Sequence, residues 1–422
     1  MAGISGSPLK PVRTSERIQA LDVARGLALF GVLQINLIFF SGHIYRNWAN
    51  VSYPLGWGGH ALTWLRDSLL EGKAMGLFSL LFGMGLCIQM ERAQSRGAGF
   101  PGFAARRLGA LALIGTIHGI FIWNGDILLD YALIGCLILG LLQFRAKSLL
   151  WGALLALLAP WAVHCFKPHF PKALLFGHWL QQAAWFLQSS DLAYGHGTWI
   201  AALKWRFWEW SHMGLALHFI DIVMCLPLFL LGAAIWRSGI LLDISTRRGA
   251  IRKIFHGTFW FGLLLNVGIF TWSEKIPASD LKGVTLYLVL LLPGMCMMFL
   301  VLGYITGVVL LLQKAHWERI LKMFAPMGRM ALTNYLSQSL IATWVFNGYG
   351  LGLWGKVTPS AYVLGGVALY AIQIAWSHWW LRRFRFGPME WLWRSASYAA
   401  WQPMRIRPVA SVPELDVAPV EP

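Results

Sequence analysis

The residues best suited to chemistry lie in one short run, H-G-I-F-I-W-N-G-D, from His118 to Asp126. An imidazole such as that of His118 can act as a base, an acid or a hydrogen-bond bridge near neutral pH. Asp126 can orient the imidazole if the intervening turn folds inward, or can simply cap the following helix. The run therefore predicts a catalytic group made of His118, Asp126 and Asn124, with the amide of Asn36 or Asn124 as the hydrogen-bond donor to an oxyanion. A packing role for His118 remains the alternative.

A second polar set lies in the first apolar run, 18–40, which contains Asp22, Arg25 and Asn36. At about 100° per residue, these three side chains fall within a helical stripe about 60° wide. Ionisable groups are costly inside a membrane unless they face protein or water, so the stripe indicates a polar cavity. An ion pair between Asp22 and Arg25 that only anchors the helix end is the alternative.

The elements that position these residues are predicted to be membrane-spanning helices. Of the 422 residues, 57% are hydrophobic and only 13% are charged, which is unusual for a soluble domain. Apolar runs of about 20 residues are long enough to cross a bilayer as helices. The predicted fold is therefore an all-α, polytopic membrane protein with about ten transmembrane helices. We place them at roughly 18–40, 74–91, 107–123, 127–143, 149–165, 214–236, 254–272, 284–312, 330–346 and 361–381.

Lys and Arg are distributed unevenly over the loops between these spans. With a cytoplasmic N-terminus, the inner segments hold 24 of the 35 basic residues and the outer segments hold 10. Because short cytoplasmic loops are enriched in Lys and Arg, both termini are predicted to lie in the cytoplasm. The predicted location is the cytoplasmic (inner) membrane. The chain then divides into a cytoplasmic segment 1–17, a transmembrane helical domain 18–394 and a disordered cytoplasmic tail 395–422.

The composition also argues against several classes of function. The net charge of +17 is scattered between apolar spans, which is a topology signal and excludes a nucleic-acid binder. There is no Walker loop, no dinucleotide-binding glycine motif and no G-x-S-x-G elbow. His218, Asp221 and Cys225 share one helical face, but a metal would need further ligands, so hydrogen bonding within the structure is the preferred interpretation. No metal and no permanently bound cofactor are predicted.

Four blocks of the sequence are similar to a known family. They are D-x-x-R-G at 22–26, IHGIFIWNGDILLDYALIG at 117–135, GRMALTNYLSQSLI at 328–341 and GPMEWLWRSASY at 387–398. The chain resembles the YeiB-like domain-of-unknown-function membrane proteins from the first span to about Arg394. That family is grouped with transmembrane acyltransferases, which pass an acyl group from a cytoplasmic thioester to a sugar or lipid acceptor at the far face.

The resemblance implies a donor and an acceptor for the predicted site. His118 would activate the acceptor or carry the acyl group, and an acyl-CoA donor would dock its phosphates on arginines, whose guanidinium groups suit phosphate. The predicted donor-binding residues are Asp22, Arg25, Asn36, Arg106, Arg107 and Arg329. The expected partners are membrane lipids, acyl-CoA and a glycan or lipid acceptor in the cell envelope.

A transporter or flippase for a small molecule or a lipid-linked precursor is the alternative function. It would use the polar stripe and His118 as a substrate path or a proton relay. Inverted repeats and broken helices, which many transporters have, are not evident in the sequence. A structural or assembly role is a third possibility.

Overall fold

The computed structural model describes residues 19–49, 51, 57–97, 99–166, 181–241, 243–273 and 283–406. Within these ranges the chain is helical, and its β-pairing is limited to an isolated bridge between Phe384 and Arg405. The all-α prediction is therefore confirmed. The cytoplasmic segment predicted at 1–17 and the part of the tail beyond 406 lie outside the described residues. The helical region continues past the predicted boundary at 394, because α19 (Pro388–Tyr398) ends four residues later.

Each predicted span overlaps a helix of the structure, although 127–143 contains only the 11 residues of α6 and 149–165 is divided between two helices. Six stretches among the described residues are long and apolar enough to cross a membrane, and exposed leucines such as Leu155 and Leu264 face outward from the helices. The chain is therefore a multi-pass membrane protein. The helices at the predicted spans are α1 (Gln19–Phe40), α4 (Lys73–Ser95), α5 (Phe100–Phe121), α6 (Leu128–Ile138), α7 (Ala146–Ala156) with α8 (Ala159–Cys165), α12 (Gly214–Arg237), α13 (Ile244–Ser273), α14 (Gly283–Leu311), α17 (Ala331–Phe346) and α18 (Pro359–Leu381).

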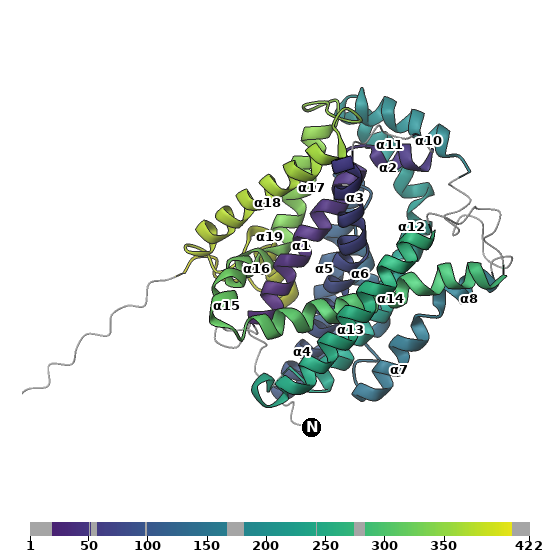
Figure 1. Cartoon of the computed structure of the whole chain (residues 1–422). Coiled ribbons are helices and arrows are strands. Elements are labelled where there is room, and N and C mark those ends of the chain that lie inside the picture. The colour runs from purple at the N-terminus through teal and green to yellow at the C-terminus, as the bar shows by residue number, and fades with distance from the viewer. Residues whose placement is uncertain are drawn as a thin grey trace, which may run out of the picture.

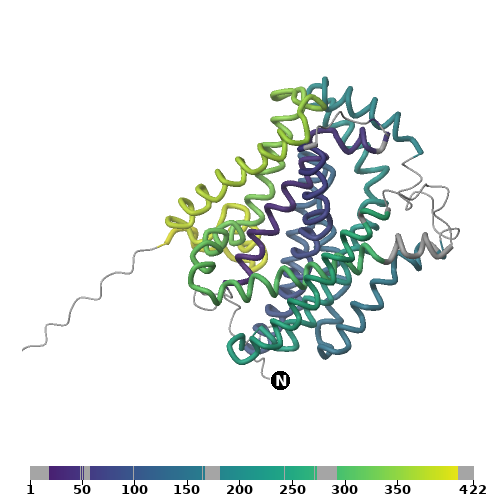
Figure 2. Tube along the Cα trace, in the orientation of Figure 1, coloured from purple at the N-terminus to yellow at the C-terminus, as the bar shows by residue number. Residues whose placement is uncertain are grey.

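Shorter helices close the two ends of this bundle. Figure 1 shows one group beside the start of α1 and another at the opposite end. The first group contains α15 (Ala315–Leu321), the 3₁₀ turn η6 (Lys322–Phe324) and α16 (Ala325–Arg329). The second contains α2 (His43–Trp48), α10 (Ala183–Ser190), the π-helical turn η4 (Asp191–Gly195) and α11 (Trp199–His212). The trace in Figure 2 also shows α13 and α14 packed side by side at the edge of the bundle, as their contacts require.

Glycines set the closest helix contacts in the core. A Cβ atom on Gly83 of α4 would lie 2.0 Å from the Phe229 carbonyl oxygen of α12, and one on Gly232 of α12 would lie 1.9 Å from the Leu80 carbonyl oxygen. The two helices therefore approach each other reciprocally through backbone contacts that only glycine permits. This contact fixes one wall of the cavity described below.

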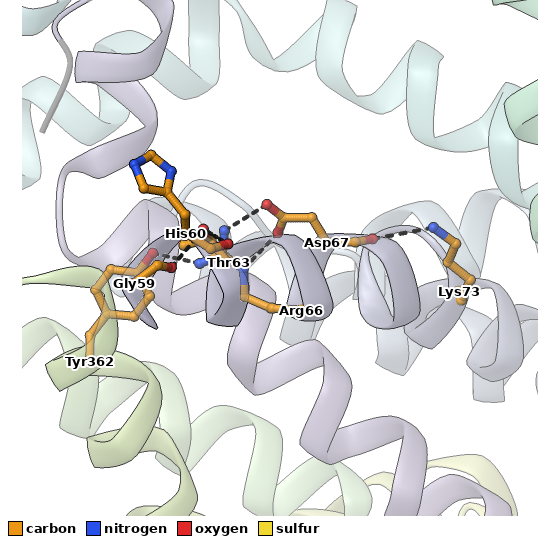
Figure 3. Close-up of polar contacts among 7 residues, drawn as sticks. All are labelled: Gly59, His60, Thr63, Arg66, Asp67, Lys73 and Tyr362. Atoms are coloured by element: carbon orange, nitrogen blue, oxygen red, sulfur yellow. Dashed lines mark hydrogen bonds and ion pairs between the residues drawn. The ribbon is translucent and has the colours of Figure 1, made fainter. Parts of the chain in front are cut away.

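The helix α3 (Trp57–Leu70) is bound to α18 by a buried arginine. Figure 3 shows Arg66 between Asp67 and Tyr362. Its Nε donates to Asp67 Oδ1 at 2.6 Å and its Nη1 donates to the Tyr362 hydroxyl at 2.5 Å. Lys73 Nζ donates back to the Asp67 carbonyl at 3.3 Å, which ties the start of α4 to α3. These bonds give the buried Arg66 and Lys73 side chains hydrogen-bond acceptors, and they hold α3 across the end of the bundle.

The predicted orientation can be tested with reporter fusions. Fusions in inner loops should report a cytoplasmic position and fusions in outer loops an exterior one, because basic residues are retained on the cytoplasmic side. Paired alkaline phosphatase and fluorescent protein reporters would measure this, and two adjacent sites with the opposite signal would contradict the orientation. The inner sites are Arg96, Arg145, Arg248 and Arg383. The outer sites are Tyr53, Tyr194, Lys275 and Lys356, of which Tyr53 and Lys275 lie outside the described residues.

Candidate functional site

A cavity of about 840 Å³ lies between the helices and contains most of the residues predicted to be functional. Asp22, Arg25 and Asn36 of α1 all line it, as their common helical stripe predicts. Arg25 Nη1 also donates to Asp22 Oδ1 at 2.9 Å. The stripe therefore lines a cavity, and it also contains an ion pair between Asp22 and Arg25.

The part of the cavity near the start of α1 is rich in arginine, and we name this set the arginine end. It consists of Arg25, Arg92, Arg107, Arg329 and Arg394. Glu390 also lines this end, but its carboxylate caps α17 by accepting from the backbone N–H groups of Leu332 and Thr333 at 2.7 and 3.1 Å and from the Thr333 hydroxyl at 2.6 Å. The arginine end therefore has an excess of positive charge and suits an anion.

The adjacent residues Arg106 and Arg107 differ in where they lie. Arg107 lines the cavity, with its guanidinium carbon 3.7 Å from the centroid of a Trp393 ring and its Nε buried without a hydrogen-bond partner among the described residues. Arg106 is exposed on the other side of α5, and its Nε donates to the Ser397 carbonyl at 3.1 Å. The predicted donor set is thus brought together in the cavity except for Arg106.

The wall between the two ends of the cavity is apolar. Leu29 and Val32 of α1 face Phe78, Leu81 and Phe82 of α4 across this section. Such a section can hold an aliphatic chain and excludes water from any polar group at its ends.

The far part of the cavity is lined by Asn124, Asp126, His218 and Asp221, and we name this set the carboxylate end. Asp126 lies in the turn between α5 and α6, and its Oδ2 accepts from the Leu129 backbone N–H at 2.8 Å, which caps α6. Its Oδ1 lies 2.8 Å from Nδ1 of His118. Asp126 therefore has both of the roles considered for it from the sequence, as a helix cap and as the partner of His118.

His118 does not itself line the cavity. It is 1% exposed, and its ring lies behind Asp126, against the rings of Tyr335 and Trp123 at centroid distances of 5.2 and 6.3 Å. Gly115 allows this arrangement, because a Cβ atom there would lie 2.5 Å from Asp126 Oδ2. The catalytic role of His118 stays a prediction, and any effect on a cavity ligand would pass through Asp126.

Asn124 connects the carboxylate end to the outer helices. Its Nδ2 donates to Glu209 Oε2 at 2.9 Å, and the same carboxylate accepts from the hydroxyls of Tyr194 at 2.5 Å and Tyr45 at 2.8 Å. Arg206, one turn earlier on α11, donates to the Phe121 carbonyl at 2.7 Å and so fixes α11 over the end of α5. One of the Asn124 N–H groups is thus held by the protein, which orients its amide at the cavity wall.

Glu209 makes the folding stability of the protein depend on pH. Burial raises the pKa of Glu209 to about 7, although bonds from Tyr194 and Tyr45 favour its ionised form. Between pH 4.5 and about pH 7 the unfolded chain releases this proton before the folded chain does, so Glu209 lowers the stability by about 3 kcal/mol across that window. The melting temperature of Glu209→Gln relative to wild type should therefore rise from pH 5 to pH 8. Thermal denaturation in detergent would measure the difference.

The variant Glu318→Gln is the matched control for this measurement, because the Glu318 side chain is 38% exposed and lies on α15 beside Lys322. Its melting temperature should follow that of wild type at every pH. A difference between Glu209→Gln and wild type that stays constant with pH would contradict a titration of Glu209.

Sequence reasoning missed several residues of this cavity. Arg92 and Arg394 were not recognised as part of the arginine end, although Arg394 lies in the block G-P-M-E-W-L-W-R. His218 and Asp221 are predicted to form hydrogen bonds within the structure; His218 Nδ1 does lie 2.7 Å from Asp130 Oδ1, and both residues also line the cavity. Their position one turn apart on α12 was the available signal. Among the described residues, no group of three or more His, Cys, Asp or Glu side chains is arranged to hold a metal ion.

Comparison with known proteins gives similarity over nearly the whole chain. Residues 235–400 match a family described as "Protein of unknown function (DUF418)". The chain is 36% identical to the uncharacterized protein YxaH of Bacillus subtilis, over 94% of this chain and 98% of YxaH. It is 28% identical to the uncharacterized protein YeiB of Escherichia coli, over 92% of this chain and 98% of YeiB. No solved structure matches the chain.

Proposed function

The chain belongs to the YeiB-like, DUF418 family of membrane proteins, and from this premise we propose that it transfers an acyl group from an acyl-CoA to an acceptor inside its cavity. One observation carries the proposal. A single cavity joins an arginine end, which suits phosphates, to a carboxylate end, which suits proton transfer, through an apolar section that suits an acyl chain.

The donor would enter from the cytoplasmic side, because the predicted orientation puts the start of α1 on that side of the membrane. Coenzyme A carries a pyrophosphate and a ribose phosphate, and these anions would bind the arginine end. Arg107 is the best-placed of these groups, because its stacking on Trp393 holds the guanidinium plane in the cavity wall. The thioester would then extend along α1 toward Asn36.

The reaction would take place where Asn36 and Asn124 line the cavity. Their amide N–H groups can donate to the oxyanion that forms as the acceptor attacks the thioester carbonyl. His118 would hold Asp126, and through it the turn that carries Asn124. The acceptor would be a hydroxyl of a glycan or lipid that reaches the carboxylate end from the outer face of the inner membrane.

Two measurements test the proposal with the purified full-length protein in detergent. Isothermal titration with coenzyme A should show saturable binding, and incubation with acetyl-CoA and a membrane extract should release free thiol and label an acceptor, identified by mass spectrometry. Heat-denatured protein is the control for both. If the protein neither binds coenzyme A nor consumes acetyl-CoA, the acyl-transfer proposal is wrong and a transport role becomes the stronger candidate.

A further inference from the structure

The cavity is lined by an imidazole that the sequence did not assign to the site. His218 lies near the start of α12 and lines the carboxylate end together with Asp221, three residues further along the same helix. Leu217 and Ile220 line the wall on either side of it. Unlike His118, His218 therefore lines the cavity directly.

The two nitrogens of the His218 ring have different surroundings. Nδ1 lies 2.7 Å from Oδ1 of Asp130, whose side chain is fully buried in the first turn of α6. Nε2 is buried and has no hydrogen-bond partner among the described residues, so an acceptor hydroxyl would reach it only after a small movement of the ring. When the Nδ1–H group donates to a buried carboxylate, the tautomer is fixed and the lone pair of the imidazole is on Nε2. This is the arrangement in which a carboxylate orients a histidine that acts as a general base.

Asp130 is itself held in place by the packing of α6. Tyr131, the next residue, donates its hydroxyl to the Met75 carbonyl of α4 at 2.9 Å and contacts the Ser79 hydroxyl at the same distance. Asp126 caps the same helix one turn earlier. The backbone of the first turn of α6 is thus held on both sides of Asp130, which positions its carboxylate opposite His218.

We infer that His218, oriented by Asp130, is the base that takes the proton from the acceptor hydroxyl. This inference rests on the proposed function. The acceptor O–H proton passes to His218 Nε2, the acceptor oxygen bonds to the thioester carbonyl carbon, and the carbon–sulfur bond breaks. Coenzyme A leaves as a thiolate and takes the proton back from His218 Nε2 as a thiol, so the imidazole is restored after each transfer.

Substitution of His218 by glutamine tests the assignment, because glutamine keeps a hydrogen bond to Asp130 but cannot accept the proton. With acetyl-CoA as the probe and a membrane extract as the source of acceptor, His218→Gln should reduce thiol release by at least about 100-fold. Coenzyme A binding should stay within about threefold of wild type, since the phosphates bind at the arginine end. The control His256→Gln changes an exposed imidazole on α13, outside the cavity, and should keep the wild-type rate.

Asp130 acts only through His218 in this mechanism, so Asp130→Asn combined with His218→Gln should be no slower than His218→Gln alone. A structural role for Asp130 would instead make the double variant worse and lower its abundance. Diethyl pyrocarbonate provides a readout that does not depend on turnover. It should modify His218 in the wild-type protein, and the modification should be detected by peptide mass spectrometry.

The failures are distinguishable. Normal thiol release by a folded His218→Gln variant, or a His218 that the reagent does not modify, overturns the base assignment while the acyl-transfer function stands. Absence of coenzyme A binding and thiol release in the wild-type protein overturns the proposed function, and the base assignment with it.

Discussion

Replacing Arg107 by methionine is expected to weaken the binding of coenzyme A by about 10- to 100-fold. A hydrogen bond to a charged group contributes about 1.5–3 kcal/mol, and about 1.4 kcal/mol corresponds to a factor of ten in affinity. Methionine keeps an unbranched chain of similar length against Trp393, so the loss should come from the guanidinium and not from packing. Isothermal titration of the purified variant would measure the dissociation constant, and the melting temperature would verify folding.

Arg106→Met is the most informative comparison for this experiment, because the two residues are neighbours with the same charge. Arg106 is exposed and bonds to the Ser397 carbonyl, so its removal should change the affinity by no more than about threefold, through the weaker long-range attraction. Increased salt should reduce this small effect further. Equal losses of affinity in both variants would contradict docking in the cavity and indicate general attraction to a basic surface.

Replacing His118 by phenylalanine is expected to lower the stability by about 1–3 kcal/mol, the usual cost of leaving a buried hydrogen-bonding group without its partner. Phenylalanine fills the space of the ring, but Oδ1 of Asp126 then has no partner in a site where both side chains are 1% exposed. His118→Gln can still donate to that oxygen and should lose much less. Membrane abundance and the melting temperature in detergent would measure the difference.

Two further variants identify the cause of that loss. Asp126→Asn removes the carboxylate charge but keeps an oxygen for the Leu129 N–H group, so adding it to His118→Phe should restore part of the stability. Lys322→Met breaks a 2.6 Å ion pair with Glu318 on the surface and should cost no more than about 1 kcal/mol. If Asp126→Asn gives no recovery in the double variant, the loss comes from packing around the ring and not from the unpaired carboxylate.

The sequence predicts well the features that depend on a single helix, such as its position in the chain and the side chains that share one of its faces. The long apolar runs locate the helices, since no other open structure satisfies the backbone in lipid. Asp22, Arg25 and Asn36 were assigned to one face by helical geometry alone, and the structure places that face on the cavity. The two roles of Asp126 were also accessible, because a capping residue and its neighbour His118 are close in the chain.

Contacts between distant segments could not be predicted in the same way. His218 and Asp130 meet across 88 positions, and nothing in the period of α12 or α6 indicates which neighbour each helix has. The separation of Arg106 from Arg107 follows from a rotation of about 100° between adjacent residues, but the pattern does not say which of them faces inward. The short helices at the ends of the bundle were missed because they are too short or too polar to resemble spans.

The opposite chemistry of the two ends of the cavity has an electrical consequence. Between the arginine end and the carboxylate end lies an apolar section in which charges are weakly screened, so the electrostatic potential falls steeply along the cavity axis. An anion bound at the arginine end would lose this favourable interaction if it moved toward the carboxylate end. Under the proposed function, this difference would hold the phosphates of the donor at the arginine end while its uncharged acyl group extends toward the carboxylate end.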